Sequence, residues 1–341
     1  MSSHLEHELR EQPEALQRLL DAQASRAVEI AELFTRSDVK YVLIASRGSS
    51  SNAARYAQYL LGRAHRVPVA FATPSLYTLY EQPPRLEGAL VVGISQSGES
   101  PDVVEVLAEA VRQGRPTVAL TNVEDSPLGR VADAVLRLEA GDELAVAATK
   151  TYLNSLGAIA LLFATATRDA EALDELRRMP AQLERQLDLS WRIALDAIEG
   201  GTVVARGVNY GTSFEIALKI RELSGLLFEA YSAADLMHGP VAAVGRGWPV
   251  IAVAPSGPAF AVMREAATEL RRRGARLLTV SDDPGLLAEA DVPLPLLAGV
   301  PEWLSPLIAV VPGQLVALRL AQLGGSDLDQ PLGLSKVTLT R

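Results

Sequence analysis

The sequence predicts an α/β fold built from two similar units, each a parallel sheet with helices on both faces. Short apolar runs alternate with amphipathic stretches along most of the 341 residues. Near-continuous runs of Val, Ile, Leu and Ala are typical of strands buried on both faces of a parallel sheet. The order strand, glycine-containing turn, helix occurs in both halves of the chain, which predicts a duplicated unit.

The first half begins with a predicted helix over 13–34, whose apolar residues recur at helical spacing behind a proline. The residues before it, including His4 and His7, are polar and are expected to fray. Amphipathic helices are expected between the strands that follow, with one at 52–61 and another at 103–111. The predicted strands cover 41–45, 89–94, 117–120 and 134–138.

The second half repeats this order. Strand 202–206 leads through Gly207 to a helix over 213–226, as strand 41–45 leads through Gly48 to its helix. From Gly48 to Ser95 is 47 residues, and from Gly207 to Pro255, which follows strand 249–254, is 48. The second turn has lost most of the hydroxyls of the first, so only the first half is expected to bind phosphate strongly. The short runs alone suit any flavodoxin-like fold.

We therefore predict five parts. They are a lead-in helix (1–36), a first sheet domain that binds the ligand (37–170), a helical linker (171–200), a second sheet domain (201–325) and a tail carrying Lys336 (326–341). An apolar helix over 304–323 closes the second domain.

The composition excludes several classes of function. A chain with 48% hydrophobic residues can bury a sizeable core. The net charge of −9 argues against a nucleic-acid partner, and the absence of cysteine excludes disulfides, thiolate metal sites and a cysteine nucleophile. The four histidines are too scattered for a metal-ligand pattern, so no metal or cofactor is expected. With no leader and no uninterrupted apolar run of about twenty residues, we expect a cytoplasmic protein with no membrane partner.

The most informative segment runs from Ser95 to Ser100, with the sequence Ser-Gln-Ser-Gly-Glu-Ser between a predicted strand and a predicted helix. It gathers hydroxyls and backbone N–H groups at the positive end of a helix, where a phosphomonoester is stabilised. It contains no Lys or Arg. Hydrogen bonds to a charged group contribute about 1.5–3 kcal/mol each, so a few of them hold a phosphate and still release it. An ordinary capped turn before a helix has the same composition.

Four further places carry candidate chemistry, each with an alternative interpretation. Glu215, Lys219 and Glu222 share one face of a predicted helix. This arrangement suits either a set of catalytic groups or a row of solvated salt bridges. His238 lies at the end of a predicted helix, just before Gly-Pro. It is either a functional residue at the mouth of a pocket or a structural histidine. The segment 142–150 contains an alanine-rich turn and Lys150, which also suits a helix start with a paired lysine. Lys336 lies in a tail that is either tied down or a surface strand.

Together these segments resemble the sugar isomerase (SIS) domain family, and within it most closely the isomerase half of the glutamine:fructose-6-phosphate amidotransferases. The match covers roughly 330 residues in order. The segments that carry it are Glu11-Gln12-Pro13, Arg47-Gly48-Ser49-Ser50, Ser95 to Ser100, Val146 to Lys150, Ala217 to Glu222, Glu229 to Pro240, and the tail with Asp329-Gln330-Pro331 and Lys336.

The resemblance implies roles for these residues. Glu222 would move a proton between C1 and C2 of a hexose phosphate, His238 would help open the sugar ring from a neighbouring subunit, and Lys336 would contact the open-chain sugar as a cation or a transient imine. Ser50, Ser95, Gln96, Ser97 and Ser100 would hold the 6-phosphate. The remaining positions expected to line the substrate are Gly48, Ser49, Glu143, Val146, Ala147, Glu215, Lys219 and Ser335.

Two departures from the family pattern shape the prediction. The chain has neither the glutaminase domain nor any cysteine, so glutamine is not expected to be its nitrogen donor unassisted, and Arg47 stands where the amidotransferases have cysteine. A stand-alone module of this kind is similar to the amino-sugar-phosphate deaminases. We therefore predict a glucosamine-6-phosphate deaminase that gives fructose 6-phosphate and ammonia. The lead-in helix, the apolar C-terminal helix and a histidine acting in trans predict a homodimer.

Several alternatives stay open. The same fold serves an ammonia-dependent or partner-assisted glucosamine-6-phosphate synthase, a galactosamine-6-phosphate deaminase, a fructosamine-6-phosphate deglycase and a plain aldose–ketose isomerase. A phosphosugar sensor without catalysis is the alternative from another class. Sensors of this type usually carry a helix-turn-helix or a partner-binding extension and do not need the Glu, His and Lys set. This sequence has that set and has no basic DNA-reading segment.

Overall fold

The computed structural model describes the chain except for residues 1, 2, 190–192, 194, 196, 197, 332, 335 and 337–341. The chain forms two compact units. The N-terminal sheet unit comprises residues 11–143 and 148–180 together with Lys336, and the C-terminal sheet unit comprises the described residues of 1–10, 144–147 and 181–334. The five predicted domain boundaries stay a prediction.

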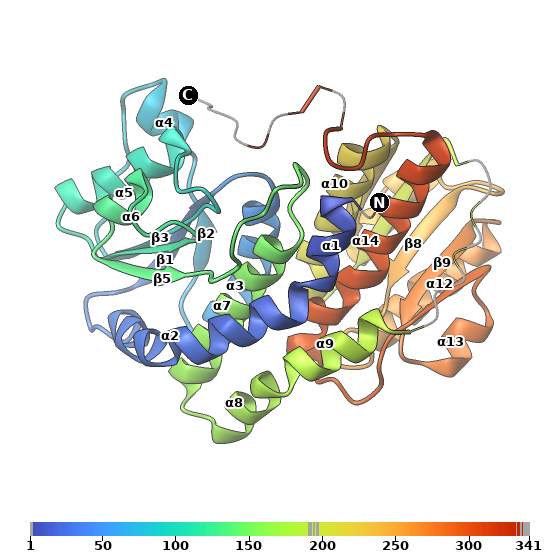
Figure 1. The fold of residues 1–341 in the computed structure, drawn as a ribbon, viewed down its shortest axis with the longest axis horizontal. Helices are drawn as coiled ribbons and strands as arrows, with labels where there is room; N and C mark the ends of the chain where they lie inside the picture. Colours follow the sequence, from blue (N-terminus) through green and yellow to red (C-terminus); the bar gives the residue numbers. More distant parts are fainter. Residues whose placement is uncertain are drawn as a thin grey trace. The chain divides into compact units, whose positions relative to one another are not determined.

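The N-terminal sheet, whose strands β1, β2, β3 and β5 are labelled in Figure 1, has five parallel strands in the order β2-β1-β3-β4-β5. Their bounds are β1 Tyr41–Ser46, β2 Val69–Phe71, β3 Ala89–Ile94, β4 Thr117–Thr121 and β5 Ala134–Arg137. Every residue of β3 and β4 is buried, as the continuous apolar runs predict.

Helices cover both faces of this sheet. One face packs against α4 (Ser75–Thr78), α5 (Pro101–Arg112) and α6 (Pro127–Val131) through a buried apolar cluster. On the other face α2 (Gln12–Phe34), α3 (Gly48–His65) and α7 (Lys150–Thr167) pack on one another, and α8 (Ala170–Arg177) packs on α7. The sheet is therefore sandwiched, with its core in two layers.

The C-terminal sheet has the same design, with the strand order β10-β9-β8-β6-β7. When its strands are counted from β6, this is the order of the N-terminal sheet, and both match the flavodoxin-like arrangement. The strands are β6 Gly200–Ala205, β7 Leu227–Ser232, β8 Pro249–Val253, β9 Arg276–Ser281 and β10 Val292–Pro295. The predicted fold of two parallel-sheet α/β units is confirmed.

In this unit α11 (Ala233–Met237) and α12 (Phe260–Arg272) cover one face through a buried cluster, and α10 (Tyr210–Ser224) packs on α14 (Ser305–Gly324) and on β6 and β7. The helices and helical turns assigned to the unit are α1 His4–Arg10, α9 Met179–Leu187 (from residue 181), η1 Gly207–Asn209, α10 Tyr210–Ser224, α11 Ala233–Met237, η2 Pro240–Ala243, α12 Phe260–Arg272, α13 Pro284–Ala288, η3 Glu302–Leu304 and α14 Ser305–Gly324.

One expectation about the N-terminus is wrong. The residues around His4 and His7 do not fray but form helix α1. Leu5 and Leu9 lie on one helical face and are 1% and 3% exposed, so the helix has an apolar anchor. The carboxylate of Asp329 accepts the N–H groups of His4 and Leu5, both at 3.0 Å, which satisfies two amides of the first turn.

Among the described residues, one helix is long and apolar enough to pass a test for a membrane span. It covers Glu302–Gly324, with a mean hydropathy of 1.6 over its most apolar window. Of that window, 83% is buried inside the protein, which is the behaviour of a core helix.

Candidate active site

Two turns leave the N-terminal sheet at its topological switch point. Strands β1 and β3 are neighbours, and Ser46 at the end of β1 lies opposite Ile94 at the end of β3. The other neighbour of β1 is β2, whereas that of β3 is β4. Ligands of open parallel sheets bind outside the carboxyl ends of the strands at such a point. The turns at 47–50 and 95–100 both begin there.

The turn after β3 leads directly into α5. The hydroxyl of buried Ser95 accepts the N–H of Gly98 at 3.2 Å, and the hydroxyl of Ser97 accepts the N–H of the second residue after it at 3.3 Å. Ser100 is the N-cap residue of α5, but its side chain makes no capping hydrogen bond. Gln96 and Ser97 are partly exposed. Hydroxyls and amides thus gather at the positive end of a helix, which suits a phosphate dianion.

The centre of this turn, at position 98, accepts only glycine. Its φ is +66°, in the left-handed region that side chains disfavour. A Cβ atom there would lie 2.0 Å from Oγ of Ser126 and 3.1 Å from Oγ1 of Thr121. Ser126 is itself fixed, because its hydroxyl caps α6 by accepting the N–H of Gly129 at 3.2 Å. The turn is therefore held tightly against the end of β4.

The turn after β1 supplies Gly48, Ser49 and Ser50 at the start of α3. Gly48 has a φ of +52°, and a Cβ there would meet no atom within 4 Å, so its conformation rather than crowding favours glycine. Ser49 and Ser50 are half-buried. Arg47 precedes them as the N-cap residue, and its guanidinium group contacts the carboxylate of Asp102 in the first turn of α5.

Glu143 is a buried carboxylate with four donors. Its Oε1 accepts the N–H groups of Thr149 and Thr151 at 2.9 and 3.1 Å, and its Oε2 accepts the Thr151 hydroxyl at 2.6 Å and the Lys336 ammonium at 2.9 Å. Burial alone would raise the pKa of Glu143. The charge of Lys336 and the hydrogen bonds from Thr151 and Thr149 outweigh burial and lower that pKa below its ordinary value. Glu143 is therefore an anion at the N-terminus of α7.

Lys336 reaches this carboxylate from the C-terminal tail, and its side chain is 27% exposed. Of the two interpretations of Lys336, the contact supports the one in which it is tied down, since its partner lies 193 positions earlier in the sequence. The earlier part of the tail is also attached, because the carboxylate of Asp329 caps α1 and its carbonyl accepts the N–H of Val146 at 3.4 Å.

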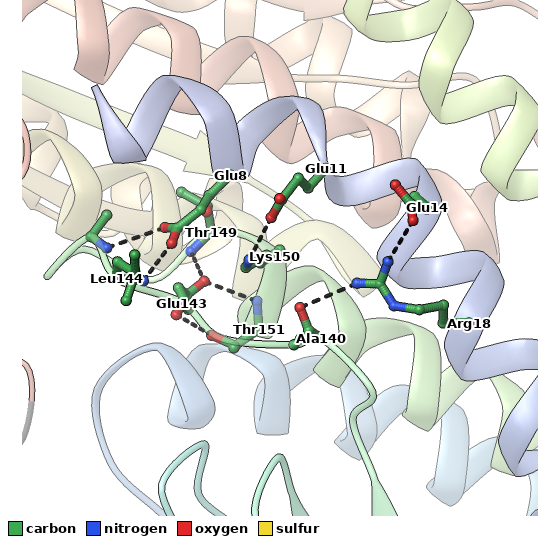
Figure 2. A network of polar contacts seen from close by, with 12 residues as sticks. Glu8, Glu11, Glu14, Arg18, Ala140, Glu143, Leu144, Thr149, Lys150 and Thr151 are labelled. Carbon is green, nitrogen blue, oxygen red and sulfur yellow. Dashed lines mark hydrogen bonds and ion pairs between the residues drawn. The ribbon is translucent and has the colours of Figure 1, made fainter. Parts of the chain in front are cut away.

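Two glutamates near the N-terminus hold the segment that follows Glu143 (Figure 2). Within the C-terminal sheet unit, Glu8 is 3% exposed, and its carboxylate accepts the N–H groups of Leu144 and, at 3.3 Å, Ala145. Within the N-terminal sheet unit, Glu11 pairs with Lys150, the first residue of α7. Lys150 is thus a helix-start lysine with an internal partner, one of the two interpretations of its sequence.

On helix α10 the three charged groups are not a solvated stripe. Glu215 is 0% and Lys219 is 1% exposed, whereas the side chain of Glu222 is 25% exposed. The Lys219 ammonium donates to Oε2 of Glu222 and lies 3.6 Å from Oε1 of Glu215. A buried lysine between two carboxylates fixes the rotamer of each, and it leaves the partly exposed Glu222 as the member that a ligand can contact.

His238 is the exposed C-cap residue of α11. Its Nδ1 lies 2.7 Å from the carbonyl oxygen of Ala234. Since a carbonyl oxygen only accepts, Nδ1 is the donor in this contact, which leaves Nε2 as the ring nitrogen that can accept a hydrogen bond. The ring is therefore oriented with a proton acceptor at its far nitrogen.

The corresponding turn of the C-terminal sheet, which lacks most of the hydroxyls, is occupied by side chains of its own unit. In the turn after β8, the N–H of Ser256 donates to the carboxylate of Asp282 at 2.7 Å, and the N–H of Ala259 donates to that of Glu302 at 3.2 Å. Internal carboxylates therefore occupy amides of this turn. A Cβ at Gly257 would lie 2.6 Å from Cβ of Glu302, so the space is filled as well.

The predicted site residues fall into two groups. The N-terminal sheet unit holds the two serine turns with Glu143 and Lys336, and the C-terminal sheet unit holds Val146, Ala147, the α10 group and His238. Ser335 lies outside the described residues. Sequence reasoning missed Asp102, Thr151 and Glu8. Asp102 could have been found, because it lies two residues after the hydroxyl-rich turn at 95–100. Within the described part of the chain, no cluster of three His, Asp or Glu residues could hold a metal ion.

The fold and these residues define a class of protein: a duplicated parallel-sheet module with a turn of hydroxyls and backbone amides at its first switch point. The SIS domain model matches residues 36–165 and 202–323, and the chain belongs to this family, as predicted.

Relatives support this assignment. The glutamine–fructose-6-phosphate aminotransferase (isomerizing) of Pyrococcus horikoshii is 34% identical over 340 residues, covering 96% of this chain and 56% of that protein. The chain thus spans just over half the length of such curated relatives. A crystal structure of a candidate phosphosugar isomerase from Silicibacter pomeroyi DSS-3 has 32% identity and a TM-score of 0.85, covering 96% and 99% of the two chains.

A glucosamine-6-phosphate deaminase from Thermotoga maritima has a TM-score of 0.79 over 99% of this chain and 100% of the other. Its sequence identity is 23%, so this likeness concerns the fold alone.

Proposed function

We propose that the protein is a phosphosugar isomerase that releases ammonia, a glucosamine-6-phosphate deaminase that forms fructose 6-phosphate. The observation that carries the proposal is the cation-free turn of hydroxyls and amides at the switch point, in a chain that aligns along 96% of its length with isomerizing aminotransferases. The 341 residues contain no cysteine that could act as the nucleophile to free ammonia from glutamine.

The phosphate of the substrate binds at the first switch point. Ser50, Ser95, Gln96, Ser97 and Ser100 surround the N-termini of α3 and α5. Their hydroxyls and the helix amides provide charge-assisted hydrogen bonds without a fixed positive charge. Such binding is specific for the anion and still permits release of the product.

The reaction proceeds through proton transfers. His238 accepts the proton of the C1 hydroxyl through Nε2 and returns it to the ring oxygen as the bond between C1 and that oxygen breaks, which gives the open-chain aldehyde. The Glu222 carboxylate then removes the C2 proton, which gives an enolamine, and returns it at C1, which gives the C2 ketimine. Lys219 holds the Glu222 carboxylate in place. A positioned acid–base group of this kind contributes about 10² to 10⁴ in rate.

Hydrolysis of the ketimine completes the reaction. Water adds to C2, the C–N bond breaks, and fructose 6-phosphate and ammonia leave, so one water is consumed for each substrate. Lys336, an ammonium donor to Glu143, supplies a positive charge beside the sugar oxygens. As an amine it would instead form a transient imine with the ketose. Trapping with borohydride in the presence of fructose 6-phosphate separates these two roles.

We further propose a cytoplasmic homodimer in which His238 completes the site of the neighbouring subunit. The exposure of His238 supports an action outside its own chain. Mixing the His238→Ala and Glu222→Gln variants under conditions of subunit exchange should restore about a quarter of wild-type activity, because half of the sites in each mixed dimer are intact. No recovery in mixed dimers would refute action in trans.

The direct test is release of ammonia and fructose 6-phosphate from purified protein supplied with glucosamine 6-phosphate. Galactosamine 6-phosphate and fructose 6-phosphate with ammonium are assayed in parallel. Turnover only in the synthetic direction would favour an ammonia-dependent synthase. Binding of a sugar phosphate without turnover of any substrate would favour a phosphosugar sensor.

A further inference from the structure

We propose that Arg47 and Asp102 form a neutral charge pair that sets how tightly the first switch point binds phosphate. Arg47 is on this view a positioning and specificity residue, not a catalytic one. The inference rests on the proposed phosphosugar site and goes beyond it, because it assigns control of affinity to a pair outside the serine turns.

The geometry joins the two anion-binding helices of the N-terminal sheet unit. Arg47 is the N-cap residue of α3 and follows β1, while Asp102 is the second residue of α5. The Nε of Arg47 donates to Oδ2 of Asp102 at 2.6 Å, and Nη2 contacts the same oxygen. The other carboxylate oxygen accepts the N–H of Val103 at 2.9 Å. The two turns are therefore tied across the switch point.

Burial makes this pair asymmetric. The side chain of Asp102 is 1% exposed, whereas that of Arg47 is 52% exposed. A buried carboxylate that loses its partner is strongly unfavourable, so Asp102 depends on Arg47. Arg47 does not depend on Asp102 in the same way, because half of its side chain is already hydrated.

The charge of Asp102 lies where the substrate anion is expected. A carboxylate in the first turn of α5 interacts favourably with the positive end of the helix, so it competes with a bound phosphate for that end. Alone it would also repel a dianion. Arg47 cancels this charge. Since residues 95–100 contain no Lys or Arg, the site with the pair intact offers only neutral donors.

Opposite effects are therefore expected from the two halves of the pair. Arg47→Met leaves Asp102 unpaired and should weaken phosphate binding, whereas Asp102→Asn releases the Arg47 charge and should strengthen it. One unit charge near a dianion at an effective surface dielectric corresponds to about a tenfold change in Kd in each direction. The double variant Arg47→Met/Asp102→Asn should return to within about threefold of wild type.

The experiment measures Kd for inorganic phosphate and for glucosamine 6-phosphate by titration calorimetry at low and at moderate salt. The matched control is Arg177→Met, which removes an arginine from an exposed pair with Asp174 in the same unit. Its Kd should equal that of wild type. In Asp102→Asn, tighter binding should also slow product release, so kcat should fall together with KM, which a purely structural role would not produce.

The Asp102→Asn variant tests the inference even if Arg47→Met fails to fold, because Asp102→Asn leaves no buried charge unpaired. Weaker binding in both single variants, or unchanged binding in Asp102→Asn, would overturn the inference while leaving the proposed function intact. A wild-type protein that binds neither phosphate nor glucosamine 6-phosphate would refute the proposed function and this inference with it.

Discussion

The Glu143→Gln substitution tests whether the buried pair with Lys336 fixes the tail and the start of α7. Glutamine has nearly the same volume, and its oxygen can keep the two N–H donors that Thr149 and Thr151 direct at Oε1. Its amide group, however, would face the Lys336 ammonium in place of Oε2. Two donors would then oppose each other in a buried site.

The size of the effect follows from this geometry. Removing one partner from a buried ion pair typically costs about 3–5 kcal/mol. Because the two hydrogen bonds at Oε1 are kept, we expect a loss of about 3 kcal/mol in the free energy of unfolding. For a unit of this size that corresponds to a decrease in Tm of about 6–12 °C.

The pH dependence has a definite sign. The folded-state pKa of Glu143 lies below its ordinary value of 4.5. A carboxylate with a lowered pKa stabilises the fold above its unfolded pKa, and that contribution is lost as the pH falls through the lowered value. The stability difference between wild type and Glu143→Gln should therefore be constant from pH 7 to about 5 and shrink below about pH 4.5.

Denaturant unfolding followed by circular dichroism measures this difference. The matched control is Glu105→Gln, which removes a carboxylate from an exposed pair with Arg112 and should change stability by less than about 0.5 kcal/mol. A Glu143→Gln protein as stable as this control at pH 7, or a stability difference that grows on acidification, would refute the reasoning.

Three further perturbations have expected outcomes. Gly98→Ala should lower stability by about 2 kcal/mol or more and abolish phosphate binding, because its Cβ would overlap Oγ of Ser126; an unchanged melting temperature would contradict this. Lys219→Met should reduce turnover at least about a hundredfold, since Glu222 loses its partner, while phosphate affinity measured by calorimetry stays unchanged. Glu8→Gln should speed amide hydrogen exchange at the residues it holds, Leu144 and Ala145, and equal protection in the variant would show that Glu8 does not hold this segment.

The fold was predictable because its signals are local. The apolar runs at 41–45 and 89–94 contain every residue of β3 and all but the last residue of β1. Helix ends were predicted less well, since α3 starts at Gly48 and not at 52, and α10 starts at Tyr210 and not at 213. A first turn rich in Gly and Ser lacks the apolar spacing from which the helices were predicted.

The site was predictable where a motif carries the chemistry and not where long-range contacts do. The turn at 95–100 was found from its composition, and its place at a switch point follows from the sheet order. Spacing on α10 could not separate a solvated stripe from a buried group, because burial of Lys219 depends on what packs over the helix. The partners of Glu8 and Asp102 lie 136 and 55 residues away in sequence, a distance that no local pattern spans.

The measurement that tests the central claim most directly is ammonia release from glucosamine 6-phosphate by Glu222→Gln beside wild type, together with the Kd of each protein for the substrate. The proposed mechanism predicts that wild type releases ammonia and fructose 6-phosphate in equal amounts. The variant should bind the substrate with nearly unchanged Kd and turn it over about 10² to 10⁴ times more slowly. A fully active variant would contradict the assignment of Glu222 as the group that moves the proton.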